Sequence, residues 1–287
     1  MQEKKRGRTH SRWLLPAALV LAGAAWFENF TLSTSTVTAA CAALPEAFSG
    51  LRIVQISDLH GRRFDAESRY LLELVRLQSP DFIALTGDLA DEFTDFSMLP
   101  PLLDGLTALA PTFYVTGNHE WVLSREKREA LFSMLDAAGV VRLQNEYRLL
   151  KKGQASIVLA GVDDPNGPYD QKRPAQLVRE IRQSRGRDAY ILMLSHRNDE
   201  LDLWANMGVQ TVLCGHGHGG IVRLPFAGAV FGTHLDLFPD YTAGLYRKGQ
   251  TSMIVSRGLG GSRKLPLRIG NRPEIVTVIL KAESGKV

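Results

Sequence analysis

The chain of 287 residues is 45% hydrophobic and 22% charged, a composition typical of a globular protein of one large or two small domains. It has only two cysteines, Cys41 and Cys214, which excludes a disulfide framework and a cysteine-rich zinc site. Of its 34 basic and 30 acidic residues, five basic and one acidic fall in residues 1–12, leaving 29 of each in the rest. A neutral body lacks the basic face that nucleic-acid binding needs, so we expect no nucleic-acid partner.

The N-terminal basic tail leads into an uncharged stretch of fifteen residues, Trp13–Phe27. This is short for a spanning helix, which needs about 20 residues, and fits a signal-peptide core or a signal anchor. No small-x-small cleavage site follows directly, and Thr31–Thr38 alternates like a strand of the fold, so we favour an anchor over a cleaved signal peptide. The alternative, a core helix of a soluble protein, fits poorly with five basic residues beside the apolar run. Residues 1–28 are therefore predicted to be a basic tail and signal-anchor segment. Residues 29–287 would form the body, which would be extracytoplasmic on a single-pass protein of the cell membrane because basic flanks stay inside.

The first half of the body alternates apolar strands with helices, as in α/β proteins. The predicted strands are Leu51–Ser57, Phe82–Thr86 and Thr112–Thr116. The predicted helices are Tyr70–Leu77, Met98–Ala110 and Ser124–Ala138. Ser124 can cap the third helix and Gly139 can end it.

The second half is richer in strands. Antiparallel strands are predicted at Val140–Leu150 and Ala155–Val162, around Lys152-Gly153. Further strands are predicted at Tyr190–Leu194, Val209–Leu213, Ile221–Leu224, Gly244–Arg247, Ser252–Val255 and Ile275–Leu280. Helices are expected at Pro174–Gln183 and Leu201–Met207. No linker divides these elements, so a single domain is predicted.

Five apolar runs each end in a side chain that can bind a metal ion. The motifs are Asp58-Leu59-His60, Gly87-Asp88, Gly117-Asn118-His119-Glu120, Ser195-His196 and Gly215-His216-Gly217-His218. Ligand sites in open α/β sheets lie at the carboxyl ends of the strands. Nitrogen and oxygen donors without thiolate suit Mn²⁺, Fe or Zn²⁺, and two adjacent sites would be complete if Asp88 bridged them.

These motifs, in this order, resemble those of the calcineurin-like metallophosphoesterases from Leu51 to Leu280. Within the family, Gly161-Val162-Asp163-Asp164 and the runs at 256–260 and 272–275 are similar to a bacterial branch of membrane-associated phosphodiesterases. The resemblance implies an α/β fold, a four-layer α/β/β/α sandwich with two central mixed sheets and a metal site at strand C-terminal ends. It implies two divalent metal ions. Asp58, His60, Asp88 and His218 would hold one, and Asp88, Asn118, His196 and His216 the other.

The resemblance also implies a reaction. A hydroxide bridging the metals would attack a phosphodiester or phosphomonoester, and His119, beside the metals, would be the general acid. Glu120 would orient His119 or simply begin the next helix. Arg62 is a candidate phosphate contact, with an exposed, solvated arginine as an equal alternative. Two departures from the family pattern are Gly217, where Thr is usual, and Arg197-Asn198-Asp199 after His196, where Pro-Asp is common.

The sequence is compatible with three functions. Two are hydrolysis of different phosphoester substrates, and the third is a non-catalytic role. A membrane anchor favours a lipid-linked or envelope phosphoester, and a soluble nucleotide is the alternative. A non-catalytic metal-binding scaffold is also known in this family, but here all seven ligand positions and His119 are present. No obligate protein partner is predicted.

Overall fold

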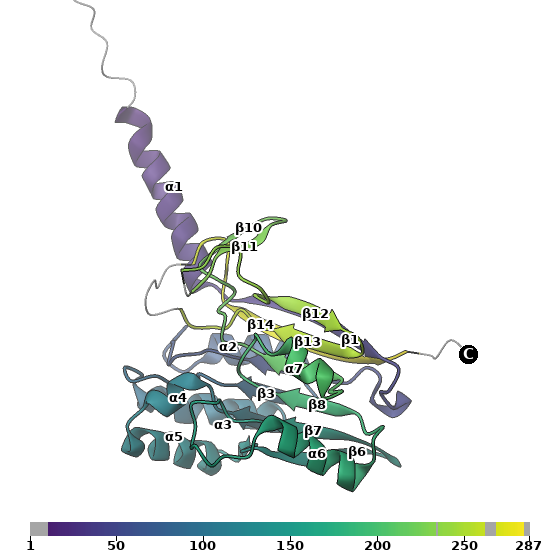
Figure 1. The fold of residues 1–287 in the computed structure, drawn as a ribbon. Coiled ribbons are helices and arrows are strands. Elements are labelled where there is room, and N and C mark those ends of the chain that lie inside the picture. The colour runs from purple at the N-terminus through teal and green to yellow at the C-terminus, as the bar shows by residue number, and fades with distance from the viewer. Residues whose placement is uncertain (1–10, 234, 262–267, 284–287) are drawn as a thin grey trace, which may run out of the picture.

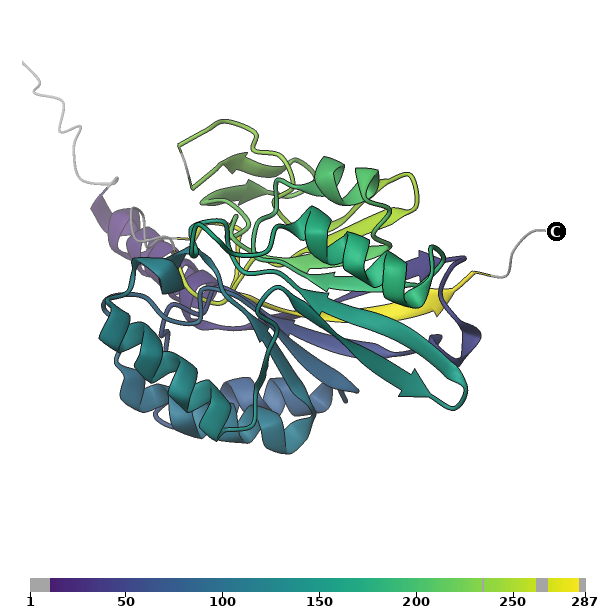
Figure 2. The same cartoon turned by 60° about the horizontal axis from the view of Figure 1, so that its bottom comes forward.

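The computed structural model describes residues 11–233, 235–261 and 268–283 (Figure 1). Two six-stranded sheets pack face to face, with helices on both outer faces (Figure 2). The predicted four-layer α/β/β/α sandwich with mixed sheets is therefore confirmed.

The first sheet has the order β1-β14-β2-β3-β4-β5 and the second the order β12-β13-β9-β8-β7-β6. The strands of the first are β1 (Ser33–Cys41), β14 (Glu274–Ala282), β2 (Arg52–Ile56), β3 (Phe82–Thr86), β4 (Thr112–Val115) and β5 (Val141–Arg142). Those of the second are β12 (Gly244–Lys248), β13 (Thr251–Val255), β9 (Thr211–Cys214), β8 (Ile191–Leu194), β7 (Ala155–Gly161) and β6 (Glu146–Lys152). A hairpin of β10 (Val222–Leu224) and β11 (Gly228–Phe231) stands apart from both sheets.

The helices are α1 (Ser11–Phe30), α2 (Arg69–Leu77), α3 (Leu99–Leu109), α4 (Asn118–Val122), α5 (Arg125–Ala137), α6 (Pro174–Arg185) and α7 (Leu201–Asn206), with 3₁₀ turns η1 (Glu46–Phe48) and η2 (Phe96–Met98). Helices α2, α3 and α5 pack on the first sheet, and α6 and α7 pack on the second. As predicted, the Ser124 hydroxyl accepts a hydrogen bond from the Lys127 N–H at the start of α5.

Strand periodicity explains why the central strands are apolar throughout. In β3, Phe82 and Ala84 pack against the opposite sheet, whereas Ile83 and Leu85 pack under the helices. Alternate side chains of a strand point to opposite faces, so a strand between two layers must be apolar on both. This burial fixes the strand register and thus the position at which each strand ends.

The predicted strand Val140–Leu150 is wrong as one element. The chain forms β5 in the first sheet, passes through Leu143–Asn145, and begins β6 in the second sheet. Asn145 has the left-handed backbone angle φ of 55°, which asparagine tolerates better than most residues. Its side-chain oxygen accepts a hydrogen bond from the Asp163 N–H. Hydrophobic alternation continues across this crossing, so it did not indicate a change of sheet.

The predicted strand after the N-terminal segment is confirmed as β1, which pairs with β14 in parallel over its full length. Before it, α1 extends from the body (Figure 1). Nowhere in the described chain is a helix both long enough and apolar enough to cross a membrane. Residues 1–10 of the predicted basic tail lie outside the described residues, and the assignment of residues 1–28 as a signal anchor stays a prediction.

Candidate metal centre

The five predicted motifs follow β2, β3, β4, β8 and β9, so strands of both sheets contribute to one place. Parallel pairing of β2, β3 and β4, and of β8 and β9, brings their carboxyl ends to the same edge. In the motifs the backbone angle φ is positive, between 48° and 67°, at Asp58, His60, Asp88, His216 and His218. Non-glycine residues rarely adopt this conformation, and they concentrate at functional sites when they do.

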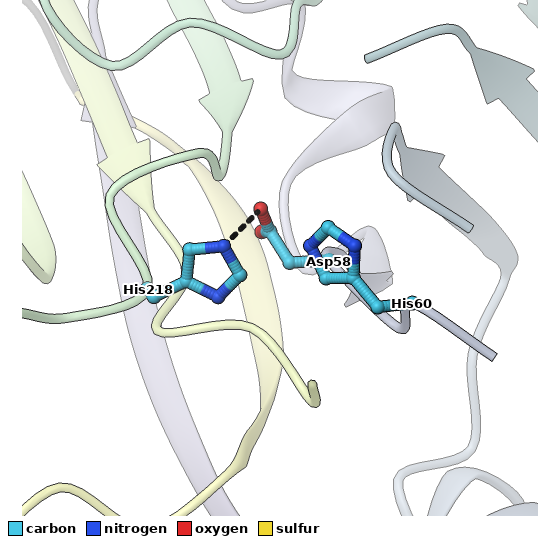
Figure 3. A group of neighbouring side chains, drawn as sticks. All are labelled: Asp58, His60 and His218. Carbon is cyan, nitrogen blue, oxygen red and sulfur yellow. Dashed lines mark ion pairs between the residues drawn. The ribbon is translucent and has the colours of Figure 1, made fainter. Parts of the chain in front are cut away.

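Three overlapping groups of side chains are each close enough to hold an ion. Within each group the candidate ligand atoms lie within 4.8 Å of one another. The groups are Asp58, His60 and His218; His60, Asp88 and His119; and Asp88, His196 and His216. In Figure 3 the rings of His60 and His218 lie on either side of the Asp58 carboxylate, reaching it from separate loops. Residues up to 160 positions apart in sequence therefore converge.

Asp88 links two of the groups into one centre. Its Oδ2 lies 3.6 Å from His60 Nε2 and 3.2 Å from His196 Nε2. His196 Nε2 is in turn 3.2 Å from His216 Nδ1, and Asp58 Oδ1 is 3.7 Å from His218 Nε2. Ligand bonds to Zn²⁺ are about 2.0–2.2 Å, so donor atoms of one ion are spaced at about these separations. Asp88 therefore lies between the two histidine groups.

Several buried polar atoms in this centre have no hydrogen-bond partner among the described residues. They are Asn118 Oδ1, both ring nitrogens of His60, His119 Nδ1 and His218 Nδ1. Buried polar atoms are nearly always paired, so a cluster of unpaired ones requires an explanation. Cations would satisfy the acceptors, and the nitrogen and oxygen donors match Mn²⁺, Fe or Zn²⁺. The residues therefore fit two divalent ions, and the assignment of each ligand to each ion stays a prediction.

Neighbouring groups hold these ligands in place. His196 Nδ1 lies 2.9 Å from the Thr86 carbonyl oxygen, so donation there leaves Nε2 free toward Asp88. The His216 N–H donates to Asp58 Oδ1, and the His119 N–H donates to Asp88 Oδ1, at 3.0 and 2.9 Å. Each carboxylate is thus fixed by the backbone of a different motif.

Glu120 acts on the loops around the centre. It lies in the first turn of α4 and is fully buried. Its carboxylate accepts hydrogen bonds from the backbone N–H groups of Asp88, Leu89 and Gly117. These bonds join the Asp88 loop to the Asn118-His119 loop, so Glu120 positions His119 through the backbone as well as starting the helix.

The electrostatics of the centre divide its histidines into two classes. Burial lowers the pKa of His196, but the carboxylate of Asp88 outweighs burial and raises that pKa to about 10. Burial lowers the pKa of His60 to about 4, and lowers that of His218 well below its usual value. Burial also raises the pKa of Asp58 to about 6. Before metal binds, these shifts favour the neutral form of His60 and His218 at pH 7 and the protonated form of His196.

Metal uptake is expected to release this proton. A coordinating imidazole must be neutral, so binding at His196 displaces about one proton per chain at pH 7, and affinity falls as the pH is lowered. Below about pH 6, protonation of Asp58 competes as well. Titration calorimetry of the metal-free protein with Mn²⁺ or Zn²⁺, in buffers of different ionisation enthalpy, measures the proton count. Uptake without proton release would contradict the protonated state of His196.

Arg62, the predicted phosphate contact, lies against α1 in the structure. Its guanidinium donates a hydrogen bond to the Asn29 carbonyl oxygen. It also lies 5.4 Å from the ring centre of Phe30 and 5.3 Å from that of Phe64. Its role in substrate binding stays a prediction, and its observed contacts connect α1 to the first ligand loop.

Arg197 is a candidate functional residue that sequence reasoning missed. Two of its guanidinium nitrogens bind the buried Asp164 carboxylate, at 2.6 and 3.0 Å, and its Nη1 lies 3.2 Å from His216 Nε2. Arg197 and His196 line a cavity of about 250 Å³ beside the centre. The unusual residues after His196 were the available signal. The sequence did not identify Asp164 as the partner of Arg197, because Asp164 lies 33 positions earlier in a predicted turn.

Comparisons with known proteins find relatives over most of the chain. The family model described as calcineurin-like phosphoesterase matches residues 51–220. Metallophosphoesterase YkuE of Bacillus subtilis is 30% identical over 267 residues, covering 90% of this chain and 89% of the relative. Phosphodiesterase YaeI of Escherichia coli is 30% identical over 234 residues, covering 80% and 82%.

Among solved structures, the protein TT1561 of Thermus thermophilus is similar with a TM-score of 0.47 and 15% sequence identity, over 74% of this chain and 92% of that one. The family match spans more than half of the chain and includes all five motifs. Family membership implies a metal-dependent phosphoester hydrolase, and the clustered Asp and His side chains support that activity. The chain belongs to the calcineurin-like phosphoesterase family.

Proposed function

We propose that the protein hydrolyses a phosphodiester or phosphomonoester at a centre of two divalent ions. One ion would be held by Asp58, His60, Asp88 and His218, and the second by Asp88, Asn118, His196 and His216. The observation that carries the proposal is the position of Asp88 between the two histidine groups, 3.6 and 3.2 Å from a nitrogen of each. When bound, such ions polarise a phosphoryl oxygen and activate water.

His119 is proposed as the group that gives a proton to the departing oxygen. Its ring meets that of His60 edge to face, with the ring centres 4.7 Å apart, and its position follows from its backbone bond to Asp88. A proton donor must lie within hydrogen-bond reach of the leaving oxygen. The position of His119 in the first turn of α4, beside the candidate ligands, supports this role.

Arg197 is proposed to bind a phosphoryl oxygen of the substrate. Its planar guanidinium matches phosphate geometry, and Asp164 holds it in one orientation. Asp164 is fully enclosed, so its carboxylate remains paired with Arg197 and keeps the side chain beside His216. The third nitrogen of the guanidinium is then the one nearest the ligands.

Replacing Arg197 by alanine is expected to lower kcat/KM about 10- to 100-fold, because a hydrogen bond to a charged group contributes about 1.5–3 kcal/mol. Most of the loss should appear in KM, and Arg197→Lys should recover only part of it. Arg142→Ala, which removes a two-bond pair with the exposed Asp136, controls for the loss of an arginine away from the centre. A fall in kcat and in thermal stability with KM unchanged would show a structural effect of the unpaired, buried Asp164 and contradict the substrate contact.

Hydrolysis assays with the purified, metal-stripped protein test the overall proposal. Bis(4-nitrophenyl) phosphate reports diesterase activity and 4-nitrophenyl phosphate reports monoesterase activity, each with Mn²⁺, Zn²⁺ or Fe²⁺ added back. Activity that requires an added ion is the expected result. Metal uptake without hydrolysis of any phosphoester would instead identify a metal-binding scaffold.

For location we propose attachment to the cell membrane through the N-terminal segment, with the body outside the cytoplasm and a lipid-linked or envelope phosphoester as substrate. The support is the sequence: five basic residues precede an uncharged run. Protease treatment of intact spheroplasts tests the orientation. The body should be digested without lysis, and protection of the body until lysis would contradict the proposal.

A further inference from the structure

Six large apolar side chains are exposed on one small unit next to the sheets, here called the apolar rim. It comprises Leu224, Phe226, Leu235, Leu237, Phe238 and Ile269. Phe226, between β10 and β11, is fully exposed, and Leu237 and Phe238 are 68% and 67% exposed. Single exposed apolar residues are common on soluble proteins, but a group of this size marks an interaction surface.

Hydrogen bonds and strand bridges hold together the segments that carry the rim residues. The Phe238 N–H donates to the Val230 carbonyl of β11, and Leu237 is bridged to Phe231. On the other side of the hairpin, Ile269 is bridged to Val222 of β10. The hairpin, the loop after it and the segment at 269 are therefore held together.

The rim continues into α1. Asn29, near the end of α1, exchanges two hydrogen bonds with the backbone of Arg268, which precedes Ile269. Figure 1 shows α1 and the β10–β11 hairpin extending from the same side of the sheets. The described part of α1 also exposes large apolar side chains, namely Leu15, Leu19, Val20, Trp26, Phe27 and Phe30.

The distribution of exposed apolar side chains around α1 indicates that the helix contacts lipid rather than a groove of another protein. Leu19 and Val20 are adjacent in sequence and so point about 100° apart, yet both are well exposed. A protein groove covers one face of a helix, whereas a helix apolar on several faces needs an apolar environment around it. At the body end of α1, Arg272 lies 4.4 Å from the ring centre of Phe27. An arginine beside an apolar helix can lay its carbon chain on apolar surface and keep its charged end at the headgroup level.

Charge at the N-terminal end of the chain favours an anionic bilayer over a neutral one for the chain as a whole. The residues that precede α1 in sequence carry Lys4, Lys5, Arg6 and Arg8 against Glu3 alone. Basic segments next to a membrane are attracted to anionic headgroups, by about 1 kcal/mol for each Lys or Arg. We propose that the apolar rim is a lipid-docking surface, which places Phe226, Leu237 and Phe238 at the headgroup boundary of a bilayer beside α1.

Docking in this way would turn the metal centre toward the headgroups. A cavity of about 350 Å³ has His216 and Gly217 on one side and the segment Gly232, Thr233, Asp236 and Tyr241 on the other. That segment contains the rim residues Leu235, Leu237 and Phe238. This step rests on the proposed function, because it makes a membrane phosphoester the substrate class that reaches the centre. The docking itself does not depend on the activity.

Site-specific labelling tests the docking with the full-length chain. Both native cysteines are buried, so Phe226→Cys and Leu237→Cys each introduce an accessible thiol for an environment-sensitive fluorophore. Leu77→Cys is the matched control. Leu77 is 58% exposed at the end of α2, just before β3 begins, and so lies at the strand edge opposite the metal centre.

Vesicles of phosphatidylcholine with phosphatidylglycerol should shift the emission of labels at 226 and 237 to the blue, and brominated lipid should quench them. The label at 77 should not respond, and pure phosphatidylcholine should give a smaller shift. If the chain binds vesicles while labels at 226 and 237 stay in water, only α1 contacts lipid and the inference is wrong. A shift that grows with protein concentration without vesicles would show a second copy covering the rim, which also overturns it.

A double variant, Phe226→Ser with Leu237→Ser, gives a second measurement. It is expected to lower the vesicle partition coefficient about tenfold or more for each side chain, whereas Leu77→Ser should not. An unchanged coefficient would contradict docking through the rim. Hydrolysis of soluble bis(4-nitrophenyl) phosphate should be unchanged in the double variant. If no variant hydrolyses any phosphoester, the proposed function fails while the labelling result still decides the docking.

Discussion

Asp88→Asn is expected to lower kcat by about 10³-fold or more, because a bound ion stabilises the transition state by several kcal/mol and each 1.36 kcal/mol is tenfold in rate. The asparagine oxygen still accepts the hydrogen bond from the His119 N–H, so the loop stays in place. The substitution removes the negative charge of the Asp88 carboxylate, which lies between a nitrogen of His60 and one of His196. Metal analysis should show fewer than two ions per chain.

The matched control is Asp163→Asn, at a buried aspartate that accepts a hydrogen bond from the Thr116 hydroxyl and belongs to none of the metal-ligand groups. It should keep both ions and most of the activity. If Asp88→Asn also retains two ions and full activity, Asp88 does not bridge and the dinuclear centre is wrong. Assays with excess Mn²⁺ distinguish two causes of a loss in Asp88→Asn. Activity should return if only the metal affinity is weakened, and should stay low if the site is lost.

His119→Asn should lower kcat about 10²- to 10⁴-fold on substrates with an alkoxide leaving group, the range expected for general acid catalysis. Nitrophenyl esters should lose much less, because a nitrophenolate departs without needing a proton. The His119 side chain is proposed to act on substrate and only its backbone binds Asp88, so both ions should remain. The measurement is kcat across a leaving-group series, with metal content determined in parallel.

Two results would contradict the acid role of His119. An equal loss across the whole leaving-group series would show that no proton transfer depends on this residue. Loss of one ion in His119→Asn would show that His119 is a metal ligand. Its side chain lies close enough to His60 and Asp88 for that role. The same loss of metal in Glu120→Gln would point to displaced loops, since Glu120 binds the backbone of both Asp88 and Gly117.

Most of the layered fold was predictable from sequence because the signals that specify it are local. Apolar runs such as Phe82–Thr86 and Ile191–Leu194 are buried on both faces, and each ends where a polar motif begins. That pattern located the candidate ligands without any knowledge of the sheets. The cap at Ser124 and the turn around Gly153 are likewise set by neighbouring residues.

The partners of the site residues were not predictable in the same way. Arg197 is held by Asp164, 33 positions away, and Arg62 contacts Asn29 across the same separation. Glu120 turned out to bind the Asp88 loop, more than 30 positions earlier in the chain. Nothing in the spacing of these residues identifies their partners, because the register and packing of whole strands decide which loops meet.

The sequence by itself determined which residues end each strand and which chemistry their side chains can perform. Tertiary structure alone decided that Asp164 holds Arg197 beside His216, that the segment 140–150 divides between two sheets, and that the apolar rim lies beside α1. The physical reason is the range of the interactions. Strand formation follows from side chains a few residues apart, whereas a shared centre or surface exists only after distant segments have packed.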